Sequence, residues 1–177
     1  VGTVLLATPR QRMGEADLAR QLELYASLLR QAPYSPRVWV TPLDGQSMIR
    51  HCDSLRMLYR QPHPLGDIIG MTESKAVLSS YYRNNVLHLL LMPSLLASAF
   101  LNNTSVRRVD LLRLAGRVYP YVAEEYFLHW RESDLPAVVD ELLEDLSNHG
   151  LLTASDDRSE FRRPAAESSE AVQLSVL

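Results

Sequence analysis

Apolar residues recur at intervals of three and four along most of this chain, and this spacing constrains its fold more than any other feature. Leu18, Leu22 and Tyr25 are spaced in this way with charged residues between them, so residues 15–31 are predicted to form an amphipathic helix. The same criterion predicts further helices over residues 46–60, 73–102, 107–128 and 134–149. The chain is therefore expected to fold as a mostly α protein, a helical bundle with a small β component.

Prolines separate the first two of these helices. Pro33, Pro36 and Pro42 favour an extended connection around residues 37–40, because proline has no N–H to donate and cannot continue a helix. The second helix is expected to end before the next proline pair, Pro62 and Pro64.

Prolines also lie inside two of the predicted helices. Pro93 falls deep within the third helix, so a kink or a break is expected near Leu91, and Pro120 is expected to bend the fourth. Thr72 and Ser105 stand where side-chain caps of these two helices are expected.

The last third of the chain has the most recognisable local plan. Ser133 or Asp134 starts a helix, and Gly150 supplies the left-handed position after it. Residues 151–153 and 160–162, joined by a polar turn, then predict a short hairpin. A helix, a glycine and a hairpin in this order form the closing half of a winged-helix unit.

Together with a short strand over residues 66–71, this pattern suggests a division of the chain into three parts. Residues 1–104 are expected to form a helical region, residues 105–165 a winged-helix-like subdomain, and residues 166–177 the truncated start of a further helix. Both ends of the chain are expected to be cuts through a longer protein, and no signal peptide is recognisable.

Composition excludes several classes of function. The formal net charge is −3, and residues 134–149 contain five acidic residues and no Lys or Arg, so nucleic acid is not an expected partner. Cys52 is the only cysteine, which rules out an internal disulfide. The most apolar run, residues 86–100, spans fifteen residues, whereas a helix needs about 20 to cross a bilayer. A buried core helix is the favoured interpretation of this run, and a helix resting on a membrane surface is the alternative.

One string has the spacing of a catalytic pair. His129 and Asp134 spell His-x4-Asp, in which a histidine acts as general base on an acceptor hydroxyl and an aspartate orients the imidazole. The pair straddles a helix end and the start of the next helix, and no phosphate-binding segment follows. A structural role, with Asp134 as a helix cap, is therefore the favoured interpretation.

Polar residues within the third helix are a second candidate site: Arg83, Asn84, Asn85 and His88. They could contact a ligand or a lipid headgroup, or dock this region onto another domain, since a buried arginine needs an anionic partner. The favoured alternative is structural, with Arg83 paired to Glu124 or Glu125 and the asparagines bonded to the backbone near Pro93.

Two further groups are weaker candidates. His51, Cys52 and Asp53, with His63, offer metal-ligating groups, but adjacent residues on a helix point in different directions, so no metal site is predicted. The arginine pairs 107–108 and 162–163 are interpreted as solvated ends of a helix and of the hairpin rather than anion sites.

Residues 79–88 (SSYYRNNVLH) followed by residues 92–97 (MPSLLA) resemble the C-terminal region of the bacterial membrane-bound glycerol-3-phosphate acyltransferases. The resemblance covers roughly residues 1–163, and further similar segments occur in the same order: residues 18–29, 33–35, 66–69 and 118–120, Glu124, residues 127–128, Trp130, and residues 132–136 and 150–151. The catalytic signatures of that family, a His-x4-Asp box, a Gly-x-Arg-Ser-rich phosphate-binding segment and a Pro-rich segment, lie upstream of this region in its members.

The resemblance implies that the whole protein transfers a fatty acyl group from acyl-CoA or acyl-carrier protein to the sn-1 hydroxyl of glycerol 3-phosphate. This takes place at the cytoplasmic face of the inner membrane, in phospholipid synthesis. The present chain is then a non-catalytic portion, without catalytic, cofactor-binding or metal-binding residues of its own, and its partner is the missing N-terminal acyltransferase domain. Membrane contact is expected through the full protein. The alternatives are a winged-helix module for protein interaction and, with least support, a self-contained enzyme built on His129 and Asp134.

Overall fold

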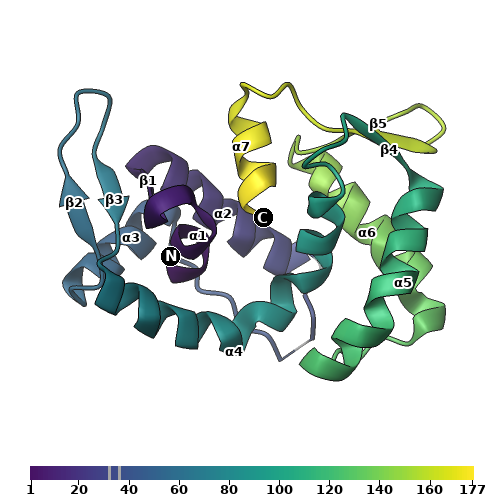
Figure 1. Ribbon diagram of the computed structural model, residues 1–177, viewed down its shortest axis with the longest axis horizontal. Helices are drawn as coiled ribbons and strands as arrows, with labels where there is room; N and C mark the ends of the chain where they lie inside the picture. The colour runs from purple at the N-terminus through teal and green to yellow at the C-terminus, as the bar shows by residue number, and fades with distance from the viewer. Residues whose placement is uncertain (32, 36) are drawn as a thin grey trace. The chain divides into compact units, whose positions relative to one another are not determined.

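Helices make up most of the chain, and two small antiparallel sheets complete it, as Figure 1 shows for the computed structural model. The structure describes residues 1–31, 33–35 and 37–177. The helices are α1 (Gly2–Ala7), α2 (Glu15–Gln31), α3 (Gly45–Ser54), α4 (Glu73–Ser98), α5 (Arg108–Tyr126), α6 (Leu135–Asn148) and α7 (Ser169–Val176), with 3-10 turns at Pro9–Gln11 and Glu132–Asp134. The strands are β1 (Arg12–Gly14), β2 (Tyr59–Gln61), β3 (Ile68–Gly70), β4 (Ser105–Arg107), β5 (Thr153–Ala154) and β6 (Glu160–Arg162). The expectation of a mostly helical fold with a small β component is confirmed.

The chain divides into two compact units, and α4 begins in the first and ends in the second. The first unit comprises residues 1–87 with Val176, and the second comprises residues 88–175 with Leu177. Within the described residues, no helix combines the length and the apolar character that crossing a bilayer would require.

In the first unit, α2 buries its apolar stripe and packs against α3. Leu18, Leu22 and Leu28 of this stripe are buried, as the predicted helix over residues 15–31 requires. The sheet has the strand order β1-β3-β2, with Ile69 of the central strand paired to Met13 on one side and Arg60 on the other. The strand expected over residues 66–71 is therefore confirmed as β3.

In the second unit, α5 and α6 pack together beside a sheet of strand order β4-β6-β5. Leu111 and Tyr119 of α5 and Val139 and Leu143 of α6 form much of the apolar core. The Tyr119 hydroxyl donates to the carbonyl oxygen of Trp130 at 2.6 Å, which fixes the segment between the two helices.

The predicted end of α6 and the predicted hairpin are confirmed. Gly150 has φ +71°, a left-handed conformation that a residue with a Cβ rarely adopts. The N–H of Leu151 then donates to the carbonyl of Leu146 at 2.9 Å, closing the helix end and directing the chain into β5. The hairpin pairs Ala154 with Phe161.

Four predicted boundaries in the middle of the chain are wrong. The third helix ends at Ser98, four residues before its expected end at residue 102. The second helix ends at Ser54 instead of extending to residue 60, because Arg56 takes a positive φ of 54° and the chain then enters β2. Ser105 belongs to β4 and does not cap α5, since residues 105–107 pair with β6. The helix α5 ends at Tyr126, two residues early, because Phe127 has φ 55°.

The prolines inside α4 and α5 do not interrupt either helix. Helix α4 runs through Pro93 to Ser98, so it does not break near Leu91, and α5 likewise runs through Pro120. Beyond Pro93, the Ser94 hydroxyl donates to the Leu90 carbonyl at 2.6 Å, four residues back in the same helix.

The apolar run over residues 86–100 and the proline-rich connection before α3 also have the structures expected for them. Leu90, Met92, Leu96 and Phe100 are buried, as a core helix over residues 86–100 requires. Residues 37–43 form neither helix nor strand, which fits the expected extended connection. Pro36, which contributes to that expectation, lies outside the described residues.

Candidate functional site

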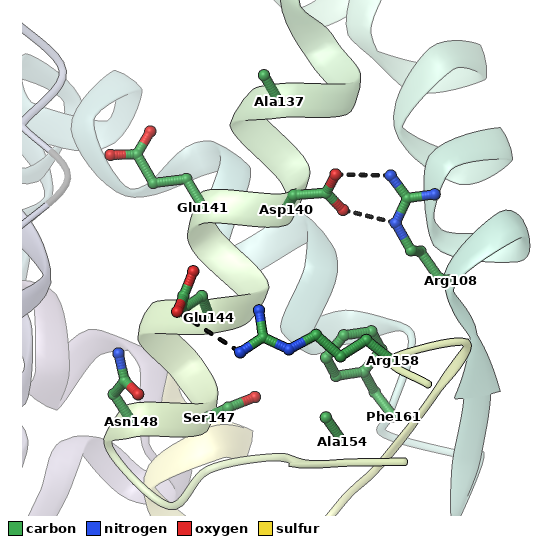
Figure 2. A pocket seen from close by; sticks show the side chains of 10 residues that line it. All are labelled: Arg108, Ala137, Asp140, Glu141, Glu144, Ser147, Asn148, Ala154, Arg158 and Phe161. Atoms are coloured by element: carbon green, nitrogen blue, oxygen red, sulfur yellow. Dashed lines mark hydrogen bonds and ion pairs between the residues drawn. The ribbon is translucent and has the colours of Figure 1, made fainter. Parts of the chain in front are cut away.

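A groove with a volume of about 550 Å³ runs along α6 in the second unit (Figure 2). One wall is α6, and the facing wall comes from the β5–β6 hairpin and the start of α5. The groove is lined mainly by charged side chains, and one aromatic ring is among them. These residues are Arg108, Asp140, Glu141, Glu144, Arg158 and Phe161.

Ion pairs bridge the two walls of this groove, as Figure 2 shows. The Arg108 guanidinium binds Asp140 through two bonds of 2.6 Å, from Nε to Oδ1 and from Nη2 to Oδ2. This carboxylate raises the pKa of Arg108. Arg158 from the hairpin reaches Glu144 at 3.7 Å. Among the described lining residues there is no histidine or cysteine, and the ionisable groups of the groove are carboxylates and guanidinium groups.

A buried carboxylate lies on the same helix. Asp145 is only 9% exposed, and its Oδ2 has no hydrogen-bond partner among the described residues. Burial raises the pKa of this carboxyl, and the nearby Glu141 raises it further. These surroundings disfavour the ionised form of the carboxyl, so an ionised Asp145 lowers the stability of the fold around α6.

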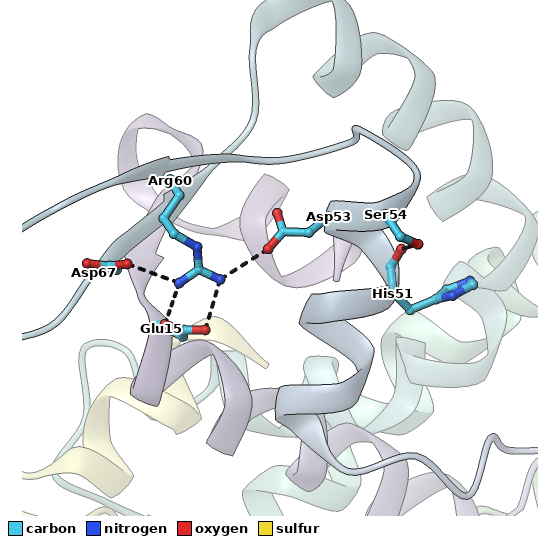
Figure 3. Close-up of polar contacts among 6 residues, drawn as sticks. All are labelled: Glu15, His51, Asp53, Ser54, Arg60 and Asp67. Carbon is cyan, nitrogen blue, oxygen red and sulfur yellow. Dashed lines mark hydrogen bonds and ion pairs between the residues drawn. The ribbon is translucent and has the colours of Figure 1, made fainter.

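Arg60 is the centre of a polar cluster in the first unit (Figure 3). Its two terminal nitrogens bind Glu15 at 2.6 and 3.0 Å, and they also reach Asp53 at 3.1 Å and Asp67 at 3.2 Å. These partners raise the pKa of Arg60, with the hydrogen bond to Glu15 as the largest cause. The cluster connects β2 to the start of α2, the end of α3 and the segment before β3, so it is a structural clamp.

The sequence candidates for a metal site are not brought together. His51 is exposed on α3 and points away from Arg60, whereas Asp53 on the same helix faces it (Figure 3). His63 lies in the β2–β3 turn, where its Nδ1 accepts a hydrogen bond from the N–H of Leu65 at 3.2 Å. Burial raises the pKa of the Cys52 thiol. Within the described part of the chain, no group of three or more His, Cys, Asp or Glu is arranged to hold a metal ion.

The polar residues of α4 are divided between its sides and between the two units. Arg83 is half-buried, its Nε is enclosed without a partner among the described residues, and its Nη2 reaches Asn84 Oδ1 at 3.5 Å, the limit for a hydrogen bond. Asn84 and Asn85 are exposed, and His88 belongs to the second unit. The pairing of Arg83 with Glu124 or Glu125 stays a prediction.

The His129-x4-Asp134 pair lies in the segment that leads into α6. The Asp134 carboxylate accepts hydrogen bonds from the Arg131 N–H and the Ser133 hydroxyl, both at 3.2 Å, and so caps the 3-10 turn before the helix. The His129 ring lies against the Trp130 ring, with the centroids 4.8 Å apart and the ring planes tilted by 33°. The contacts of Asp134 are those of a turn, and its side chain makes no capping hydrogen bond to α6 itself.

Both members of the arginine pair 107–108 meet carboxylates. Arg107 Nε donates to Asp110 at 2.8 Å, and Arg108 is held by Asp140. Arg162 on the hairpin is exposed, as a solvated strand end is expected to be. The groove along α6 and the Arg60 cluster have no signal in sequence spacing, because their members come from segments between 7 and 45 residues apart.

Comparison with known proteins places the whole chain in one family. The family described as "Glycerol-3-phosphate acyltransferase C-terminal region" matches residues 1–177. Similar curated proteins, each named glycerol-3-phosphate acyltransferase, occur in Pseudomonas paraeruginosa at 44% identity, in Pseudomonas aeruginosa at 44% and in Pseudomonas putida at 41%. In each case the alignment covers 100% of this chain and 21% of the relative. No solved structure matches the chain.

The resemblance found in residues 79–97 is therefore confirmed along the full length of the chain. The chain spans about a fifth of the length of the curated relatives it matches, so it corresponds to one region of those proteins. This chain belongs to the family of glycerol-3-phosphate acyltransferases, as their C-terminal region.

Proposed function

We propose that this chain is the non-catalytic C-terminal portion of an enzyme that acylates the sn-1 hydroxyl of glycerol 3-phosphate. The acyl donor is acyl-CoA or acyl-carrier protein. The observation that carries the proposal is the match of residues 1–177 to the C-terminal region of this family, at 44% identity to a protein named for the activity.

The contacts of the candidate residues favour a structural role over a catalytic one. The Asp134 carboxylate is engaged by the Arg131 N–H and the Ser133 hydroxyl, which occupies the oxygens that a catalytic aspartate would use to orient an imidazole. Arg60 and Arg108, the two arginines with the most extensive carboxylate contacts, are likewise used in bonds within their own units. In this proposal the chain stabilises the acyltransferase part of the polypeptide, and no residue of it enters the reaction.

An acyl-transfer assay tests the proposal. Glycerol 3-phosphate and acyl-CoA are supplied to this chain and to a longer polypeptide that carries the acyltransferase part. We expect turnover only from the longer polypeptide, and His129→Ala in that polypeptide is expected to leave the rate unchanged. Turnover by residues 1–177 alone that is abolished by His129→Ala would overturn the proposal.

A protein-interaction module is the second candidate function, and the second unit supports it. In the sequence, helices α5 and α6 come between strand β4 and the β5–β6 hairpin. The three strands form a sheet of order β4-β6-β5, and this arrangement fits a winged helix. The groove along α6 carries Asp140, Glu141 and Glu144, which repel phosphate, so the partner of such a module is a protein and not nucleic acid.

We also propose that the whole enzyme works at the cytoplasmic face of the inner membrane, where its lipid product is used. Membrane contact is then a property of the complete polypeptide. Fractionation of cells that express the longer polypeptide tests this placement, and recovery of all activity in the supernatant without membranes would contradict it.

A further inference from the structure

The first turns of α4 present an apolar face to solvent in the first unit. Val77 is 70% exposed, Tyr81 67% and Tyr82 58%, and Leu78 and Val86 are also exposed. Spacings of four residues place Tyr81 beside Val77 and Tyr82 beside Leu78, and Val86 continues the row of Leu78 and Tyr82 by one further turn. We call these five residues the α4 face.

The opposite side of the same turns already holds the helix in place. Ala76 and Ser79 are buried, and the Ser79 hydroxyl lies 3.3 Å from the sulfur of Met71. Because this inner side makes the contacts with the rest of the first unit, the α4 face is not needed to anchor the helix. Five neighbouring exposed apolar side chains, two of them aromatic, exceed what isolated surface residues produce and mark an interaction surface.

Its chemistry favours a protein over a membrane as the occupant. Tyrosine is enriched at protein interfaces, where its flat ring and its hydroxyl both find partners. The rings of Tyr81 and Tyr82 already pack edge to face, with centroids 5.7 Å apart, so little freedom remains to be lost on binding. A membrane-surface helix carries many basic residues on its polar side, whereas the turns that carry this face hold only Lys75 and Arg83.

The identity of the occupant follows from the relatives and from α1. The matched relatives are about five times as long as this chain, and the matched part is their C-terminal region, so most of their length precedes it. Gly2 of α1 lies against α4, where a Cβ on Gly2 would come within 3.0 Å of the Ser79 Cβ. Ser79 is on the buried side of α4, so a polypeptide that leads into α1 arrives at the side of this helix opposite the α4 face, and it needs to pass around only this one helix to reach that face.

We propose that the α4 face docks the acyltransferase part of the same polypeptide. This inference rests on the proposed function, because it names the surface through which the C-terminal portion would support that part. The side chains that enter the interface are those of Val77, Leu78, Tyr81, Tyr82 and Val86.

Tyrosine nitration followed by mass spectrometry tests this assignment. Residues 1–177 and the longer polypeptide are labelled under the same conditions, and Tyr121, which is 79% exposed in the second unit, serves as the internal control. Tyr81 and Tyr82 are expected to react at least about ten-fold more slowly in the longer polypeptide, because a docked interface excludes reagent from its centre. Tyr121 is expected to react at the same rate in both. Equal rates for Tyr81 in the two polypeptides would overturn the proposal.

The same labelling separates this occupant from two others. If Tyr81 in residues 1–177 alone becomes more protected from nitration as the protein concentration rises, the occupant of the α4 face is a second copy of this chain and not the acyltransferase part. If Tyr81 becomes protected when anionic phospholipid vesicles are added, the occupant of the α4 face is a membrane. Either result overturns the assignment.

Substitution gives an independent measurement. Tyr81→Glu in the longer polypeptide is expected to restore fast nitration of Tyr82, whereas Tyr121→Glu is expected to leave it slow. Circular dichroism of both variants of residues 1–177 checks that the first unit still folds. If the longer polypeptide transfers acyl groups while Tyr81 reacts freely, docking fails and the proposed function stands; if Tyr81 is protected without any transfer, the proposed function fails alone.

Discussion

Gly45, at the start of α3, lies directly against the backbone of Ala19 in α2. A Cβ built on Gly45 would come within 2.7 Å of the Ala19 carbonyl carbon and 2.8 Å of its Cα, and backbone atoms cannot move aside as a side chain can. The N–H of Gly45 also donates to the Glu23 carboxylate of α2 at 3.0 Å. The two helices thus meet at a point where only glycine fits.

Gly45→Ala is therefore expected to lower the free energy of unfolding of the first unit by about 1–3 kcal/mol, the usual effect of overpacking. Gly116→Ala is the matched control, because Gly116 is exposed inside α5 and has nothing within 4 Å of its would-be Cβ. That change is expected to stabilise the second unit by about 0.5–1 kcal/mol through helix propensity. Urea unfolding of both variants measures the difference, and equal midpoints would contradict the close approach at Gly45.

Arg60→Leu is expected to destabilise the first unit, because it leaves Glu15, Asp53 and Asp67 close together without their shared cation. We expect a loss of about 1–2 kcal/mol, which allows for solvent screening because the Arg60 side chain is 35% exposed. Arg60→Lys keeps the charge but cannot form the two-pronged bond to Glu15, so an intermediate loss is expected.

Thermal unfolding at low and high salt measures the effect of these Arg60 substitutions. As a control, Arg20→Leu removes an exposed ion pair with Asp17 and is expected to change stability little. A loss for Arg60→Leu no larger than that for Arg20→Leu would rule out the structural clamp.

Asp145→Asn is expected to raise stability at neutral pH, because the amide replaces a buried carboxylate whose Oδ2 has no partner among the described residues. The folded pKa of this carboxyl is raised, so its ionisation destabilises the fold at pH values above that pKa, and stability recovers as pH falls through it. The benefit of the asparagine should therefore shrink on acidification. Asp140→Asn, which breaks the bonds to Arg108, should have the opposite sign at neutral pH.

Asp157 holds the turn of the β5–β6 hairpin, and its carboxylate accepts hydrogen bonds from Ser155, at 2.7 Å, and from Ser159. These bonds lower the pKa of Asp157 to about 2. A folded pKa below the unfolded one gives stability that is present above about pH 4 and lost as pH falls toward 2. Asp157→Asn should reduce the loss of stability between about pH 4 and pH 2. Titration of the carboxyl carbon of Asp157 by NMR should find the low pKa. A normal pKa would show that the turn does not hold the carboxylate.

Features whose signals lie close together in the sequence were predictable. The stripe of α2, the left-handed Gly150 and the hairpin after it each depend on residues a few positions apart, and all three are present. Strand β4 was missed because its partner lies far along the chain: Ser105 and Val106 are too few residues to show a period, and only pairing with β6 makes them a strand.

The candidate site follows the same rule. Asp134 was expected to be a cap, and its carboxylate does accept the Arg131 N–H, but it closes the 3-10 turn and not α6 itself. The clamp at Arg60 could not be foreseen, because Glu15 lies 45 residues away and the other two carboxylates are ordinary surface residues in sequence. Ion pairs of this kind are fixed by tertiary packing, which no local pattern encodes.

The sheet of the second unit also sets an order of events during synthesis on the ribosome. Among the described residues, strand β4 pairs only with β6, and Ser105 lies opposite Arg162, a separation of 57 residues from position 105 to position 162. At an elongation rate of about 5–20 residues per second, β4 leaves the peptidyl-transferase centre about 3–11 s before its partner is made. During that interval the nascent chain carries an unpaired strand edge, and the trigger for completing the second unit is the arrival of the hairpin rather than the helices that precede it.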